Sequence, residues 1–212
     1  MKLIRKKTTW VSYLQMGTFG WFFFILGPCL VLYGDEKGLN PVQISLHMSV
    51  MSLAAGISGF IVPKIVNKTS RGISMRIAAS TFVIAIFTLV TANSMPVSMV
   101  ACFVVGLSAT GVVSLSTSFL DQAHDTFATA AISEANAFGA VGGILGPLFV
   151  GFTVSAGFGW RIGMLVSAVG FFLVEILRGP LTAYNIKKHE SSSAHHGKLS
   201  ADYWWAWALL IT

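Results

Sequence analysis

Ionisable and hydroxyl side chains attract attention in this sequence where they interrupt long apolar stretches. Glu134 is the sharpest case, because it lies about seven residues, or roughly 10 Å of helical rise, into the apolar stretch 128–152. No Lys or Arg is expected at that depth, and burial without a cationic partner favours the protonated form of a carboxyl group. Glu134 is therefore a candidate proton-coupling group, with a hydrogen bond to a neighbouring helix as the alternative.

A stripe of polar side chains follows the apolar stretch 97–119. Its members are spaced by three or four residues, which places them on one face of a helix. Such a face offers hydrogen bonds to a solute; the alternative is that its hydroxyls bond back to their own helix. The candidate substrate contacts are this stripe and three residues of the first apolar stretch: Tyr13, Gln15, Trp21, Thr110, Ser114, Thr117 and Asp121.

Other kinds of chemistry have little support in the sequence. It contains no metal-binding cluster, phosphate-binding loop or nucleophile motif, and His195 and His196, in a Ser-rich segment, are weak metal ligands. Cys29 and Cys102 lie within apolar stretches and are expected to be buried thiols. His47 is expected near a membrane surface, where its ring can reach water. We therefore expect no cofactor, no metal and no enzymatic activity.

The elements that carry these residues are predicted to be membrane-spanning helices. The chain of 212 residues is 54% hydrophobic and 10% charged, with a mean hydropathy of +0.73, whereas soluble domains carry about 25% charged residues. A helix needs roughly 20 mostly apolar residues to cross a bilayer. Six stretches are long enough: 10–33, 42–63, 77–95, 97–119, 128–152 and 160–178. A further apolar stretch begins near Tyr203 and is too short to cross before the sequence ends.

The basic residues predict how these helices are oriented. With the N-terminus in the cytoplasm, all 14 Lys and Arg residues except Lys37 and Arg161 fall on the cytoplasmic side. Because these charges are scattered over the ends of separate helices, they explain the net charge of +6 without nucleic-acid binding. The expected location is the plasma membrane, with the lipid bilayer and a small-molecule substrate as partners.

A glycine-rich segment inside the fifth apolar stretch predicts close helix packing. Residues 139–151 read GAVGGILGPLFVG, and Gly139, Gly142 and Gly146 fall on one helical face. Small residues let membrane helices approach backbone to backbone, and Pro147 loosens the hydrogen bonding of its helix. The segment is expected to form a helix–helix contact, or a flexible seam between two moving halves.

These motifs resemble those of the major facilitator superfamily of transporters. Gly142, Gly146 and Pro147 match the G-x-x-x-G-P of the family's fifth helix, where the match favours proton-coupled export by antiport. In the loop after the second stretch, Gly59 and Lys64 match the family's motif, and both are expected to act in helix packing or conformational change. Pro63 stands where the family has an acidic residue, so the charge network of that loop is not expected in its usual form.

The resemblance implies an all-α membrane protein that works by alternating access. Residues 1–179 would form the six-helix N-terminal half of the transporter, 180–201 a cytoplasmic linker, and 202–212 the truncated start of a seventh helix, with the C-terminal half of the same protein as the missing partner. The alternatives are a non-transporting six-helix assembly subunit and a half-size transporter that acts as a homodimer. A chain that ends within a span argues against both alternatives.

Overall fold

The computed structural model describes residues 3–185, and those residues fold into α-helices and two short 3-10 turns. The helices are α1 (Lys7–Lys37), α2 (Pro41–Lys68), α3 (Arg71–Thr91), α4 (Met95–His124), α5 (Ala128–Ser155) and α6 (Arg161–Arg178), and the turns are η1 (Asp125–Phe127) and η2 (Leu181–Tyr184). No strand occurs among residues 3–185, which confirms the all-α class. The predicted seventh helix, His195, His196 and most of the predicted linker lie outside the described residues.

Four helical stretches of the described chain are long and apolar enough to cross a membrane. They are Lys7–Lys37, Pro41–Lys68, Arg71–Thr91 and Met95–Ser155, and the last of them covers both α4 and α5. Helix α6 is shorter, with 18 residues, and carries Arg161, Glu175 and Arg178. These helices identify a multi-pass membrane protein, whereas six separate crossings stay a prediction.

Two of the described helices, α2 and α3, begin at side-chain caps that lie outside the predicted apolar stretches. The side chain of Asn40 accepts a hydrogen bond from the amide of Gln43 at 2.9 Å, and this capping box starts α2. The hydroxyl of Ser70 caps α3 in the same way. Helix α3 therefore runs from Arg71 to Thr91, earlier than the predicted 77–95, because hydropathy locates apolar residues and not caps.

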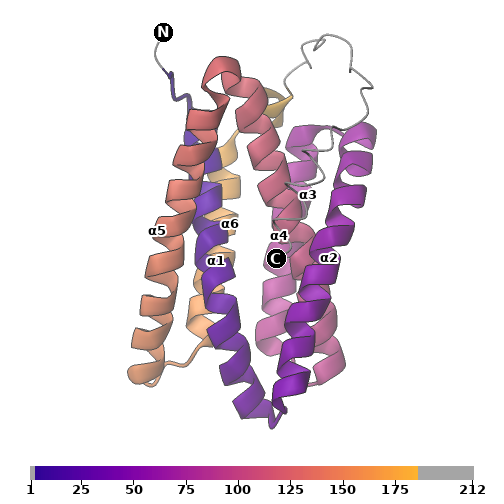
Figure 1. Ribbon diagram of the computed structural model, residues 1–212, viewed down its shortest axis with the longest axis vertical. Coiled ribbons are helices and arrows are strands. Elements are labelled where there is room, and N and C mark those ends of the chain that lie inside the picture. Colours follow the sequence, from indigo (N-terminus) through magenta and orange to yellow (C-terminus); the bar gives the residue numbers. More distant parts are fainter. Residues whose placement is uncertain (1–2, 186–212) are drawn as a thin grey trace, which may run out of the picture.

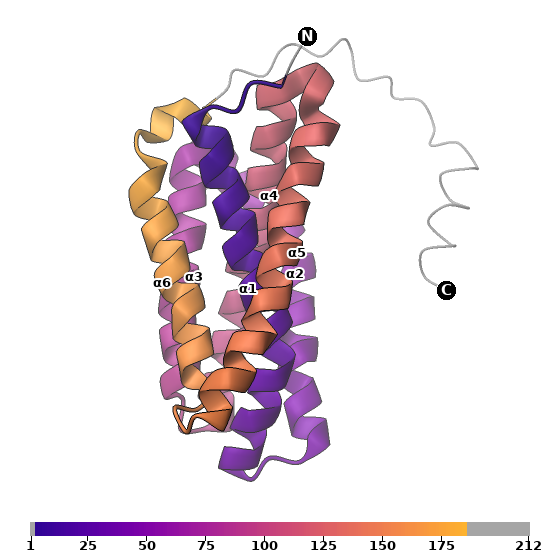
Figure 2. The same cartoon turned by 90° about the vertical axis from the view of Figure 1, so that its left-hand side faces the viewer.

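Figure 1 shows α5, α1, α4 and α2 side by side, with α6 and α3 behind them. Helix α1 packs chiefly on α5, α2 packs on α4, and α3 lies against both α4 and α6. The first residues of α1, the α2–α3 and α4–α5 connections and the end of α6 meet at one end of the bundle, which we call the N-terminal end (Figure 2). The other end, with the α1–α2, α3–α4 and α5–α6 connections, is the opposite end.

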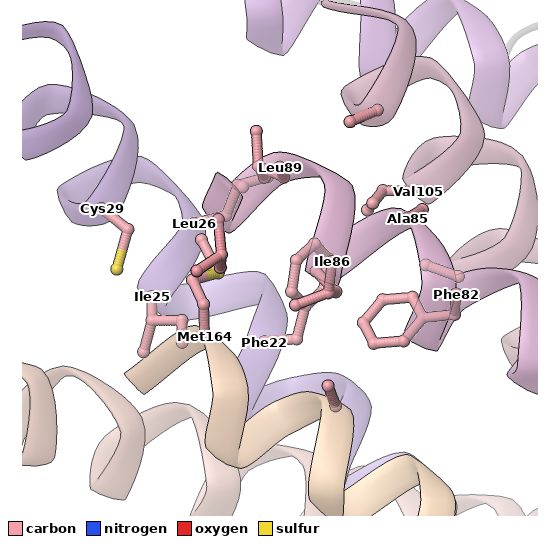
Figure 3. Packing of buried hydrophobic residues seen from close by; sticks show 14 of the residues in the cluster. Phe22, Ile25, Leu26, Cys29, Phe82, Ala85, Ile86, Leu89, Val105 and Met164 are labelled. Carbon is pink, nitrogen blue, oxygen red and sulfur yellow. The ribbon is translucent and has the colours of Figure 1, made fainter. Parts of the chain in front are cut away.

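Aromatic rings join α1, α3 and α6 in the core. The ring of Phe82 stacks on that of Phe171 at a centroid distance of 4.0 Å and meets Phe22 edge to face at 4.8 Å. Figure 3 shows Phe22 and Phe82 with the aliphatic side chains around them. Cys29 and Cys102 are buried free thiols, as predicted.

The glycine-rich face of α5 packs directly on α1, which confirms the predicted helix–helix contact. A methyl carbon built at Gly142 would collide with the carbonyl of Gly17, and one built at Gly20 would collide with the carbonyl of Gly139. At Gly146 the methyl would lie 2.8 Å from a side-chain carbon of Ile25 and 3.0 Å from the carbonyl of Trp21. The two backbones therefore touch along this glycine seam, with Pro147 inside an unbroken helix.

Gly59 and Lys64 of α2 take no part in a comparable contact within the described chain. Both are exposed, and a methyl carbon built at Gly59 meets no atom within 4 Å. Their expected role in helix packing or conformational change stays a prediction.

Candidate functional site

The polar stripe of α4 lies on an open face of that helix. Ser114 and Asp121 are exposed, and Thr110 and Thr117 are half-buried. Among residues 3–185, none of the three hydroxyls donates a hydrogen bond to its own helix, whereas the half-buried Thr88 of α3 donates to the carbonyl four residues earlier at 3.0 Å. Within the described chain these three hydroxyls therefore make no bond back to α4, and which molecule they contact stays a prediction. Their hydrogen-bonding capacity is open to another molecule or to another part of the protein.

A polar residue of α5 that the sequence reasoning missed also has hydrogen-bonding groups without a partner in the described chain. Asn136 is exposed, and no described residue bonds its amide. Side chains two positions apart on a helix are rotated by about 200° about its axis, so Asn136 points away from Glu134. The signal was present in the sequence, because an amide inside an apolar stretch needs a partner as much as a carboxylate does.

Glu134 lies beside the N-terminal segment and has a cationic partner. Arg5 donates from Nε to Oε2 at 2.8 Å and from a terminal nitrogen to Oε1 at 2.5 Å, and the hydroxyl of Tyr13 donates to Oε2 at 2.8 Å. These hydrogen bonds raise the pKa of Arg5. The expectation that Glu134 lacks a cationic partner is wrong, because Arg5 precedes α1 and reaches back along the bundle.

The two candidates Tyr13 and Gln15 are buried in the bundle. Tyr13 is part of the Glu134 cluster, and its ring also lies against Phe138 at 5.5 Å. Gln15 is fully buried, and its side-chain oxygen accepts a hydrogen bond from Arg178 of α6. Neither side chain shares the open face of α4.

Arg178 is a buried cation whose importance the sequence reasoning missed. Its side chain is 1% exposed, and it donates to Oε1 of Glu175 from Nε at 2.8 Å and from a terminal nitrogen at 2.6 Å. Its guanidinium carbon lies 4.9 Å from the ring centre of Tyr184, which follows α6 in the turn η2. Burial raises the pKa of Tyr184. The i, i+3 spacing of Glu175 and Arg178 was the available signal.

Trp21 lies in a different part of the bundle from the α4 stripe. Its indole nitrogen donates to the carbonyl of Gly163 at 3.1 Å, and its ring lies 5.3 Å from Phe149. It lines a groove between α1, α5 and α6. The structure therefore separates the sequence candidates. The stripe forms a polar face on α4, and Trp21 lies at the α5–α6 side. Tyr13 and Gln15 are buried, the first beside Glu134 and the second beside Arg178.

His47 is buried, in contrast to its expected place near water. It is 0% exposed; its Nδ1 lies 2.7 Å from the carbonyl of Gln43 and its Nε2 lies 2.8 Å from the hydroxyl of Ser98 on α4. The expectation was wrong because the partner, Ser98, comes from a helix distant in sequence.

An ion pair closes the opposite end of the bundle. Arg161, at the start of α6, donates to both carboxylate oxygens of Glu36 at 2.6 and 2.7 Å and to the carbonyl of Val90 at 3.1 Å. It therefore ties α1, α3 and α6 together. Lys37 adds a bond to the side chain of Asn93 at 3.2 Å. Arg161 and Lys37 are the basic residues at the opposite end within the described chain.

A family model described as Major Facilitator Superfamily matches residues 13–211 of the chain. The match includes α2 to α6, the α4 stripe and the glycine seam. No curated protein matches the sequence.

Proposed function

The chain belongs to the major facilitator superfamily, and on that premise we propose that it moves a small solute across a membrane by alternating access. Membership of this family supports a membrane transporter. One structural observation supports the more specific proposal of a solute site. The hydroxyls of Thr110, Ser114 and Thr117 lie on one open face of α4 with no hydrogen bond to the described chain. A transporter of this class binds its solute at a face of that kind, between two bundles.

Lipid is a poor occupant of this face. A hydroxyl without a partner in an apolar medium loses its hydrogen bonds to water and gains none. Hydroxyls that face lipid can avoid this cost by bonding to their own helix, as Thr88 does. The α4 stripe does not, so water, a solute or a second polar surface is the fitting neighbour.

We assign the substrate contacts to Thr110, Ser114 and Thr117, with Asp121 at the mouth of the site near the N-terminal end. Asn136 of α5 joins them as a further candidate. For Tyr13, Gln15 and Trp21 we propose structural roles instead, and the bond that each makes to a neighbouring helix supports this. The solute that fits is small and carries hydrogen-bonding groups.

The proposed partner is a second bundle of the same protein, which covers the open face of α4 from the other side. Rocking of the two bundles would expose the site to each side of the membrane in turn. We propose that the N-terminal end faces the cytoplasm, because the described basic residues gather there, apart from Lys37 and Arg161.

The pairing of Glu134 with Arg5 bears on proton coupling. A carboxylate that accepts hydrogen bonds from a guanidinium and a phenol is held in its charged form. Of the two roles considered for Glu134, the contacts support the structural one, and we propose that it ties α5 to α1 and to the N-terminal segment.

Transport assays test the proposal. They use cells that express the protein as its gene encodes it. Uptake and efflux of a panel of labelled metabolites should identify a solute. For that solute, Thr110→Val and Thr117→Val should each raise KM roughly two- to tenfold, as expected for one lost hydrogen bond of about 0.5–1.5 kcal/mol. Thr88→Val, at a hydroxyl that bonds its own helix, is the matched control and should leave KM unchanged.

Two results would count against this assignment. Equal KM values for wild type, both α4 variants and the control would remove the α4 stripe from the site. If no solute of the panel moves and the protein is instead recovered in a stable complex with another membrane protein, the assembly-subunit alternative would gain support.

A further inference from the structure

A pocket of about 370 Å³ lies between α1 and α5 at the N-terminal end of the bundle. It is separate from the proposed solute site, because none of the hydroxyls of the α4 stripe lines it. Small-molecule sites have volumes of about 300–1,000 Å³. The lining combines a carboxylate and a guanidinium with aromatic rings and one small side chain: Arg5, Trp10, Tyr13, Glu134, Ala137 and Phe138.

Three aromatic rings form the apolar wall of this pocket. The ring of Trp10 lies 5.6 Å from that of Tyr13 and 6.0 Å from that of Phe138, in both cases edge to face. Trp10 is 46% exposed, so part of its ring is open to a ligand. Aromatic faces attract cations through the quadrupole of the ring. The wall therefore favours a ligand that combines a positive charge with an apolar body.

The carboxylate of Glu134 has a fixed orientation and can be reached from outside. The fully buried Tyr13 donates to Oε2 at 2.8 Å and so orients the carboxylate from the protein side. The Glu134 side chain is 34% exposed, and Arg5 donates to both of its oxygens, from Nε and from a terminal nitrogen. A flat guanidinium or amidinium group matches two carboxylate oxygens in this way, whereas an ammonium group acts as a point charge. The carboxylate therefore selects a cation with a fork of N–H donors.

Arg5 itself is attached to the pocket by little else in the described chain. It precedes α1 and lies between the exposed Ile4 and Lys6, and the side chain of Lys6 makes no capping bond to the helix. Water screens an ion pair at this exposure. Exchange of Arg5 for another cation with the same donors therefore costs little free energy, and α1 and α5 stay joined through the glycine seam.

We propose that this pocket binds an aryl guanidine or aryl amidine, and that Arg5 is a tethered competitor for its carboxylate. The cationic group of the ligand donates to both oxygens of Glu134, in the place of Arg5. The aromatic body of the ligand lies against Trp10 and Phe138. The proposal concerns a second site and does not depend on which solute is transported.

Isothermal titration calorimetry of the purified protein with phenylguanidine tests this site. We expect Arg5→Gln, which removes the competitor, to bind the probe roughly two- to fivefold more tightly than the wild type does. Glu134→Gln should bind it at least about tenfold more weakly, because a charged hydrogen-bond partner is lost. Trp10→Ala should bind it roughly two- to fivefold more weakly. Lys6→Gln is the matched control: it removes a neighbouring exposed cation and should leave the affinity unchanged.

The gain of affinity in Arg5→Gln is the decisive result, since a variant that fails to fold does not gain affinity. Benzylamine, which has an ammonium in place of the fork, should bind Arg5→Gln more weakly than phenylguanidine does, and equal affinities would overturn the ligand class. A gain in Lys6→Gln as large as that in Arg5→Gln would overturn the role of Arg5 as competitor. No binding to either the wild type or Arg5→Gln, or an unchanged affinity in Glu134→Gln, would overturn the proposal as a whole.

Discussion

Charged side chains of this bundle tie distant segments together at both ends. At the N-terminal end Arg5 bonds Glu134, and the two residues are 129 positions apart in the chain. Both side chains are about one-third exposed, at 36% and 34%. At that exposure water and salt screen the attraction, so the ion pair orients the N-terminal segment more than it stabilises the fold.

A double-mutant cycle measures this ion pair. Arg5→Gln and Glu134→Gln should each lower the free energy of unfolding slightly, and the coupling between them should be small, as for other exposed pairs. Thermal unfolding in detergent gives the values, with Lys6→Gln as the control for a neighbouring exposed cation. A coupling energy of zero would show that Arg5 and Glu134 do not meet in solution.

Removal of the buried cation Arg178 should have a far larger effect. Arg178→Met leaves the carboxylate of Glu175 and the amide oxygen of Gln15 buried without their donor, which typically costs about 3–5 kcal/mol. The double variant Arg178→Met with Glu175→Leu should regain part of that loss, since no unpaired charge remains. A single variant as stable as wild type in thermal unfolding would contradict the buried geometry.

At the scale of residues, the sequence located polar side chains and thiols within apolar helices better than it predicted their partners. Glu134, Thr110 and Cys29 were identified from their place in apolar stretches, which periodicity and composition reveal. Their surroundings depend on contacts between helices far apart in the chain. For that reason the Arg5 partner of Glu134 and the burial of His47 against α4 could not be derived beforehand.

At the scale of elements, α1 and α5 meet through backbone atoms. Gly142→Ala should therefore lower stability by about 1–3 kcal/mol, the usual cost of overpacking, because its methyl collides with the carbonyl of Gly17. Gly151→Ala on the same helix is the matched control, as its methyl meets no atom within 4 Å. It should be neutral or more stable by up to about 1 kcal/mol, since Ala favours the helix. Thermal unfolding of both variants compares them, and equal stability would mean that α1 and α5 are further apart.

The sequence predicted the glycine seam from one side only. The face formed by Gly139, Gly142 and Gly146 follows from helical spacing, and the contact is confirmed. Its partner face, with Gly17 and Gly20 on α1, was not recognised, although the two glycines are three residues apart. The spacing of the glycines shows that one helix face carries only small side chains. Which helix packs on that face depends on the packing of the whole bundle.

At the scale of the whole molecule, the described basic residues lie at the N-terminal end, apart from Lys37 and Arg161 at the opposite end. The bundle is therefore expected to keep its N-terminal end in the cytoplasm. Thr126→Cys at that end should resist a membrane-impermeant maleimide applied to intact cells, and Ala156→Cys at the opposite end should react. Both positions are exposed, and the native thiols are buried. The reverse labelling pattern would invert the topology.

The pairing of α1 with α5 also governs how the protein is made. Tyr13 of α1 and Glu134 of α5 are 121 residues apart. A ribosome adds about 5–20 residues per second, so roughly 6–24 seconds separate the synthesis of these two contacts. Throughout that interval α1 has emerged without the helix that fills its glycine groove. Until α5 arrives, Gly17 and Gly20 therefore face lipid or another helix, and α5 has to displace that neighbour to form the seam.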